Sequence, residues 1–271
     1  MGLALRFRSR SRARGGLRRA ALCCAIAVAA AGLVAGTPAQ AQSQTWGGTG
    51  STTTTAGYKV GTNWSHPPAG APVAAGKSAV FDATGSSTIV VGAGAITPDS
   101  WTFNANSQSY TITGAAVNFS ATGGLFNNAN AGQTISISNN LGESAAGAQL
   151  QQLGNSTLVL TGANTYSGGT VIAAGTLQLG NGGTTGKIDG DVLDLSVLAF
   201  NRSNNVTFGS LIFGSGQVNQ IGGGTLVLSG GNSYSGGTLI SNFSTLRVTN
   251  STPGISSSVG TGTVTLQDGE F

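Results

Sequence analysis

Short runs of alternating apolar and polar residues recur along this chain, with the period of two that a half-buried β-strand shows. In residues 157–161, Leu158 and Leu160 fall on one face and the intervening residues fall on the other. Each run ends at glycine, asparagine or serine, which favour tight turns. Beyond Ala41, no segment has the period of an amphipathic helix. The pattern therefore predicts an all-β protein built from many short strands.

One stretch of the chain occurs twice. Residues 157–179 read TLVLTGANTYSGGTVIAAGTLQL, and residues 225–248 read TLVLSGGNSYSGGTLISNFSTLRV. From 157 to 170 and from 225 to 238 the copies differ at only three positions, where one small residue replaces another. The second copy carries one extra residue near its end. Self-similarity of this kind indicates an architecture of stacked repeats.

The spacing of the leucines predicts the type of stack. Leu158 recurs as Leu177, and Leu226 recurs as Leu246. This spacing of roughly 20 residues fits one coil of a right-handed parallel β-helix, in which three short strands are joined by tight corners. The next coil lies about 4.8 Å away. At roughly 20 residues per coil, residues 42–271 would make about eleven coils.

Residues shared by the two copies are expected to pack inside the coil or to turn its corners, because one coil is stable only when neighbours cover it. These residues are Leu158, Leu160, Asn164, Tyr166, Gly168 and Gly169 in the first copy, and Leu226, Leu228, Asn232, Tyr234, Gly236 and Gly237 in the second. A ligand-binding pair of aromatic residues is the alternative interpretation of the two tyrosines.

The same alternation predicts strands on both sides of the first copy. Short strands are expected at residues 79–81, 89–91, 192–201 and 206–221, and inward pairs at Trp101/Phe103, Tyr110/Ile112, Val117/Phe119 and Ile135/Ile137. Trp46, Tyr58 and Trp64 are expected to cap the first coils. Val264 and Leu266 are expected to point inward at the start of another coil.

Residues 1–41 have the pattern of a cleaved signal peptide. Seven arginines at positions 6–19 precede the apolar run at positions 20–35, and Ala39 and Ala41 supply the small residues of a cleavage site after Ala41. The run is shorter than the roughly 20 residues of a membrane-spanning helix. The Arg-Arg pair at 18–19 raises the twin-arginine route, but its flanking residues favour the general secretory route.

Removing this segment changes the charge. It holds seven of the 12 Lys and Arg residues, which leaves five against eight Asp and Glu and a net charge of −3 for residues 42–271. The whole-chain pI near 9.4 therefore does not indicate a nucleic-acid partner. Cys23 and Cys24 also lie in the segment, as apolar filler rather than a lipoprotein anchor. A mature chain without disulfides suits a protein that crosses a second membrane unfolded.

Residues 153–180 and 222–240 together resemble the autotransporter-associated β-strand repeat of passenger domains, also called the passenger-associated transport repeat. The most specific part is NTYSGGT in one copy and NSYSGGT in the other. The segments TWGG, NWS, AVFDATG, SWTF and YTITG are similar to the beginning of such passengers. The resemblance covers essentially all of residues 42–271.

The resemblance implies the passenger of a type V secretion protein, a non-enzymatic, surface-displayed rod like an adhesin or stalk, whose repeats aid passenger folding and export. Its implied partners are the secretory translocon, signal peptidase, an outer-membrane translocator barrel and a host or matrix surface ligand. No segment here resembles a C-terminal β-barrel, so we expect a passenger truncated before it. The intact protein would reach the cell surface or the extracellular space, and this chain alone would stay in the periplasm.

Candidate chemistry is sparse. The one cluster of charges comprises Lys187, Asp189, Asp191 and Asp194. Asp189 and Asp191 alternate onto one face and could touch a calcium ion, although a solvated acidic corner is the simpler interpretation. His66 precedes two prolines, which suits a turn better than a catalytic base. We therefore expect no enzyme, cofactor or metal. The alternative is a β-helix that binds or degrades polysaccharide.

Overall fold

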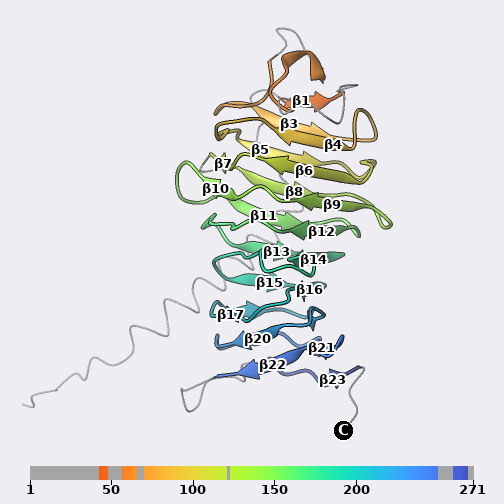
Figure 1. Ribbon diagram of the computed structural model, residues 1–271, viewed down its shortest axis with the longest axis vertical. Helices are drawn as coiled ribbons and strands as arrows, with labels where there is room; N and C mark the ends of the chain where they lie inside the picture. The colour runs from red at the N-terminus through yellow and green to blue at the C-terminus, as the bar shows by residue number, and fades with distance from the viewer. Residues whose placement is uncertain (1–42, 48–56, 66–69, 121–122, 250–258, 268–271) are drawn as a thin grey trace, which may run out of the picture. The chain divides into compact units, whose positions relative to one another are not determined.

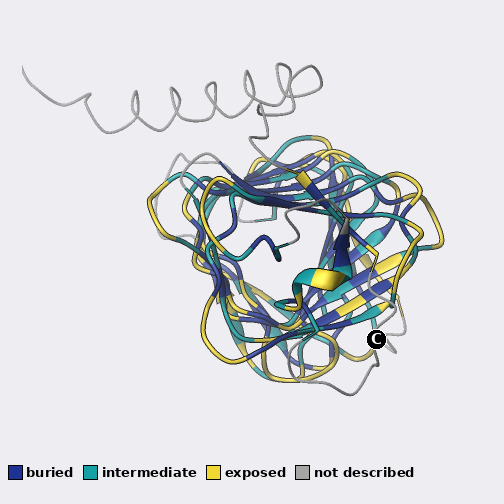
Figure 2. Cartoon of the chain, turned by 90° about the horizontal axis from the view of Figure 1, so that it is seen from above, coloured by how far each residue is buried: buried dark blue, intermediate teal, exposed yellow. Residues whose placement is uncertain are grey.

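The computed structural model describes residues 43–47, 57–65, 70–120, 123–249 and 259–267. The predicted signal peptide, its cleavage site at Ala39 and Ala41, and His66 lie outside these residues. In the described part, successive turns of the chain stack one above the other (Figure 1). Seen from above, the turns superpose into a closed ring (Figure 2).

Each turn passes through three sides, which we call the first, second and third side. The first side is a nine-stranded sheet with the order β2 (Trp64–Ser65), β1 (Ser43–Trp46), β3 (Ser78–Phe81), β5 (Ser100–Phe103), β8 (Gly124–Asn127), β11 (Gln149–Gln152), β13 (Thr170–Ile172), β15 (Val192–Asp194) and β18 (Ile212–Phe213). A short 3-10 turn, η2 (Gly61–Asn63), precedes β2.

The second side is also a nine-stranded sheet. Its order is β4 (Thr88–Val91), β6 (Tyr110–Gly114), β9 (Thr134–Ile137), β12 (Thr157–Leu160), β14 (Thr176–Leu179), β16 (Val197–Phe200), β19 (Gln217–Gln220), β21 (Thr238–Ile240) and β23 (Val264–Leu266). The third side holds the segment that follows each second-side strand. Its strands are the pair β7 (Val117–Phe119) and β10 (Leu141–Glu143), and the sheet of β17 (Val206–Phe208), β20 (Thr225–Leu228) and β22 (Thr245–Val248).

All strand pairs in the described residues are parallel except β1 with β2. The predicted all-β parallel helix is thus confirmed as a β-solenoid. The expected number of about eleven coils is wrong, because the described residues form nine second-side strands, which mark eight turns. The early turns are longer than the repeat spacing suggests, since Trp101 lies beside Leu125 and Leu125 lies beside Leu150.

The interior is built from columns of inward side chains. On the second side, Leu158, Leu177, Leu198 and Val218 lie one below another in register, and all four are fully buried. Successive turns therefore cover each other's leucines, which supplies the burial that a single turn lacks. In the last described strand, Val264 and Leu266 continue the inward columns of β21, as predicted, but are about half exposed (48% and 55%).

Aromatic side chains fill the first turns. Trp46, Tyr58 and Trp64 are buried, and the ring centroid of Trp64 lies 5.1 Å from that of Trp46 and 4.9 Å from that of Tyr58. The indole N–H of Trp64 donates to the Tyr58 carbonyl (2.8 Å), and that of Trp101 to the Tyr58 hydroxyl (2.8 Å). The antiparallel strand β2 lies at the end of the first side beyond β1. This arrangement agrees with the predicted tryptophan-rich cap.

Candidate functional site

The two sequence copies occupy different sides of the solenoid. In the first copy, TLVL forms β12 on the second side, and Thr165 then donates its backbone N–H to Leu141 of β10 on the third side (2.8 Å). In the second copy, TLVL forms β20 on the third side, and Ser233 donates its backbone N–H to Ile212 of β18 on the first side (2.9 Å). The copies are therefore rotated about the solenoid by one side.

The rotation follows from turn length. The column that starts at Leu158 reaches Val218 after three turns, whereas Leu226 comes later in the same turn, on the next side. The outward residues of the two copies thus point in different directions. What the copies share is their inward chemistry.

A buried asparagine links neighbouring turns through side-chain hydrogen bonds in both copies. Asn164 is fully buried; its Oδ1 accepts the backbone N–H of Leu141 in the preceding turn (3.0 Å), and its Nδ2 donates to the Lys187 carbonyl in the following turn (2.8 Å). At the matching position, Asn232 Oδ1 accepts the backbone N–H of Ile212 (2.9 Å). These amides satisfy backbone groups that the corners leave without a strand partner.

A buried tyrosine–threonine pair also occurs in both copies. The Tyr166 hydroxyl lies 2.8 Å from Thr170 Oγ1, and the Tyr234 hydroxyl lies 2.6 Å from Thr238 Oγ1. Burial raises the pKa of both phenols, so both stay protonated at neutral pH. Since both tyrosines are at most 2% exposed, they are packing residues, and the aromatic ligand pair considered as an alternative is not formed. The sequence did not predict the threonine partners of these tyrosines.

Glycine at one position is required by close approach of the preceding turn. A Cβ on Gly168 would fall 2.4 Å from the Gly147 carbonyl oxygen, and a Cβ on Gly236 would fall 2.4 Å from the Gly216 carbonyl oxygen. Both oxygen atoms belong to the backbone. The first glycine of the SGG sequence therefore lets two turns pass within backbone contact.

A glutamine corner precedes each copy and was missed from the sequence. The side-chain N–H groups of Gln152 donate to the carbonyls two and four positions ahead (2.7 and 3.0 Å). Those of Gln220 make the same two bonds (3.0 and 2.9 Å). Both side chains are at most 2% exposed. Extending the comparison backwards would have aligned LQQLG with VNQIG and revealed this glutamine.

The extra residue of the second copy changes one corner. In the first copy this corner uses Gly175 at φ +64°, whereas in the second Asn242 and Phe243 have φ values of 56° and 52°. L-residues rarely adopt this region. The Phe243 side chain is 86% exposed. The extra residue thus places a side chain outside the solenoid.

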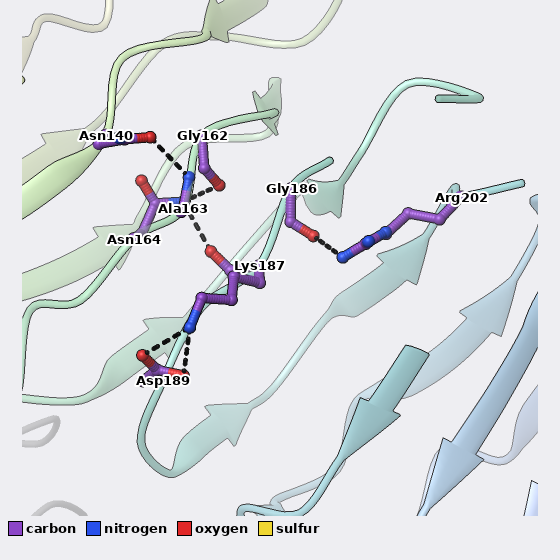
Figure 3. A network of polar contacts seen from close by, with 8 residues as sticks. All are labelled: Asn140, Gly162, Ala163, Asn164, Gly186, Lys187, Asp189 and Arg202. Carbon is purple, nitrogen blue, oxygen red and sulfur yellow. Dashed lines mark hydrogen bonds and ion pairs between the residues drawn. The ribbon is translucent and has the colours of Figure 1, made fainter. Parts of the chain in front are cut away.

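Figure 3 shows how side chains hold the corners around the first copy. Asn140 Oδ1 accepts the backbone N–H of Ala163 (2.8 Å), and the guanidinium of Arg202 donates to the Gly186 carbonyl (2.9 Å). Burial lowers the pKa of Arg202. These groups therefore bond to the backbone of neighbouring turns.

The acidic cluster is divided by the fold. Asp189 is exposed and forms an ion pair with Lys187 (3.2 Å), whereas Asp191 Oδ1 accepts the backbone N–H of Leu211 (2.9 Å). Asp194 is fully buried, so the interpretation as a solvated corner is wrong for this residue. Asp194 lies two residues after the inward Val192 in the same strand, and this alternation indicated that its side chain also points inward. Within the described ranges, no three or more His, Cys, Asp or Glu side chains gather to hold a metal ion.

A family model described as Passenger-associated-transport-repeat matches residues 150–179 and 218–242. Two segments of the chain are therefore similar to this transport repeat. These matches include both glutamine corners and the shared asparagines, tyrosines and glycines. The transport repeat is therefore the unit whose inward contacts recur on two different sides of the solenoid.

The chain is also similar to "Adhesin BmaC autotransporter" from Brucella suis biovar 1 (strain 1330), at 40% identity over 82 residues. The match covers 30% of this chain and 2% of that protein. Together with the transport repeats, it supports an autotransporter passenger domain. No solved structure matches the chain. In the part of the chain that the structure describes, no helix has the length and apolar character needed to span a bilayer.

Proposed function

We propose that this chain is a passenger region of a type V secretion protein, a non-enzymatic rod displayed at the cell surface in the manner of an adhesin or stalk. The observation that carries the proposal is the pair of transport repeats built into a continuous parallel solenoid. The autotransporter relative supports the same role. No observation favours the polysaccharide-directed alternative, because the polar side chains of the repeat bond to the protein's own backbone.

The repeats stabilise the solenoid through inward contacts between neighbouring turns, and this helps the passenger fold and be exported. The rotation between the copies supports this, since a partner that recognised their outer faces would meet them on two different sides. The proposed export partners are the secretory translocon, signal peptidase cleaving after Ala41, and a translocator barrel. The proposed site residues are the leucines, asparagines, tyrosines and paired glycines shared by the two copies.

The test compares inward and outward substitutions at neighbouring positions of both repeats. The chain is fused to a translocator barrel, and surface display is measured by protease treatment of intact cells. We expect Asn164→Ala with Asn232→Ala to reduce display severalfold, because buried backbone groups lose their partners. The control pair, Thr165→Ala with Ser233→Ala, alters exposed side chains and should leave display unchanged. An asparagine pair displayed as well as the control pair would contradict the proposal.

A further inference from the structure

Asp194 places a carboxyl group inside the solenoid, in the turns between the two transport repeats. The side chain is fully buried. Its Oδ1 accepts the backbone N–H of Ser196 (3.1 Å), whereas Oδ2 has no hydrogen-bond partner. A Cβ on Gly216 would lie 2.2 Å from Oδ1, so the carboxyl packs directly against the following turn. An ionised carboxylate in such a place lacks the donors that its charge requires.

The neighbours of Asp194 in the same inward column show what this position favours. The column runs through Asn127, Gln152 and Ile172 to Asp194. Asn127 donates to Gln152 Oε1 (2.7 Å), and Gln152 donates to two carbonyls. Both polar predecessors are thus neutral amides that supply N–H donors. A protonated carboxyl also has a donor, whereas a carboxylate has none.

We propose that the turn containing Asp194, between the two repeats, opens in a pH-dependent way. It stays closed while the carboxyl is protonated and opens more readily when the carboxyl ionises. Burial raises the pKa of the carboxyl by more than hydrogen bonding by the backbone N–H groups of Ser196 and Leu198 lowers it. Tyr234, which lies two turns farther along the first side, is the titratable side chain whose pKa, already raised by burial, the charge of Asp194 raises further. Tyr234 stays neutral, with its hydroxyl held by Thr238. The ion pair found in the described residues, Lys187 with Asp189, does not include Asp194. No described cation therefore compensates the charge.

The direction of the pH effect follows from proton linkage. Burial raises the pKa of Asp194 from 3.8 to about 7. The closed turn therefore holds the proton more tightly than the open turn, and its extra stability is lost as the pH rises from about 4 to about 7. In this window the opening equilibrium constant grows about tenfold per pH unit and then levels off. Between pH 5 and pH 8 we expect about a hundredfold increase.

Hydrogen exchange of the full chain measures this opening. Protection of the backbone amides at residues 192–200 and 212–220, corrected for intrinsic exchange, should fall about a hundredfold from pH 5 to pH 8. The neutral isostere Asp194→Asn should remove that dependence. The control Asp189→Asn, at an exposed position, should retain it. Equal pH dependence in Asp194→Asn and the unsubstituted chain would overturn the proposal.

A second measurement does not require a folded variant. Carboxyl-carbon NMR of the unsubstituted chain follows the protonation of Asp194 directly. We expect its midpoint near pH 7. A midpoint near the ordinary aspartate value of about 4 would overturn the proposal.

Discussion

Replacing Asn164 by alanine is expected to destabilise the solenoid by about 3 kcal/mol. The amide joins three successive turns through Leu141, Asn164 and Lys187. Its loss leaves the buried N–H of Leu141 without this partner, at a cost of about 1–3 kcal/mol, and removes one of the two hydrogen bonds to the Lys187 carbonyl oxygen, at a cost of about 1 kcal/mol. The measurement is the free energy of unfolding in urea, followed by tryptophan fluorescence.

Asn140 provides the matched control for this substitution. It lies at a neighbouring corner and also bonds to the backbone of the next turn, through the Ala163 N–H. Its side chain is exposed, so water replaces the lost partner after Asn140→Ala. We expect a loss below about 1 kcal/mol. Equal losses of unfolding free energy in the two variants would show that the hydrogen bonds of the buried asparagine do not hold the turns together.

Alanine at Gly168 or Gly236 is expected to separate neighbouring turns. The added methyl group would meet a backbone carbonyl oxygen at 2.4 Å in each case. Backbone cannot turn aside as a flexible side chain does, so we expect a loss of about 3 kcal/mol or more at either position. Thermal unfolding of the two variants, followed by circular dichroism, measures the effect. Similar losses are expected, because the two positions are equivalent although they lie on different sides.

Gly223 separates this steric effect from a general cost of replacing glycine. A Cβ at Gly223 meets nothing within 4 Å. Gly223→Ala should therefore leave the unfolding temperature within a few degrees of the unsubstituted chain. A Gly168→Ala variant as stable as Gly223→Ala would refute the close approach of the two turns.

Local pattern was sufficient to predict the architecture. The alternation around Leu158 and Leu160 and the spacing to Leu177 predicted inward columns, and the structure places these residues in register. The number of turns was overestimated because the repeat spacing was applied to the whole chain. The loops between Trp101 and Leu125 lengthen that turn, and loop length leaves the strand alternation unchanged.

Contacts between turns could not be predicted in the same way. Two nearly identical sequences give no sign of the side on which each begins, because that depends on every turn length between them. The partners of Asn164, at Leu141 and Lys187, depend on stacking for the same reason. Asp194 is different, since its alternation with Val192 marked it as inward. The acidic neighbours obscured that signal.

Engineered cysteine pairs provide the most direct test of the rotation between the two repeats. Cys23 and Cys24 lie in the predicted signal peptide, so residues 42–271 are free of other thiols. Val197 is the register partner of Gln217 in the next turn of the second side. Thr225, the first residue of β20 in the second repeat, instead pairs with Thr245 on the third side.

Neighbouring parallel strands lie about 4.8 Å apart, within the Cα separation of about 4.4–6.8 Å that a disulfide spans. Under mild oxidation we expect Val197→Cys with Gln217→Cys to form an intramolecular disulfide. We expect Val197→Cys with Thr225→Cys to remain reduced. A disulfide in the second pair and none in the first would place the second repeat on the same side as the first, and would contradict the rotation.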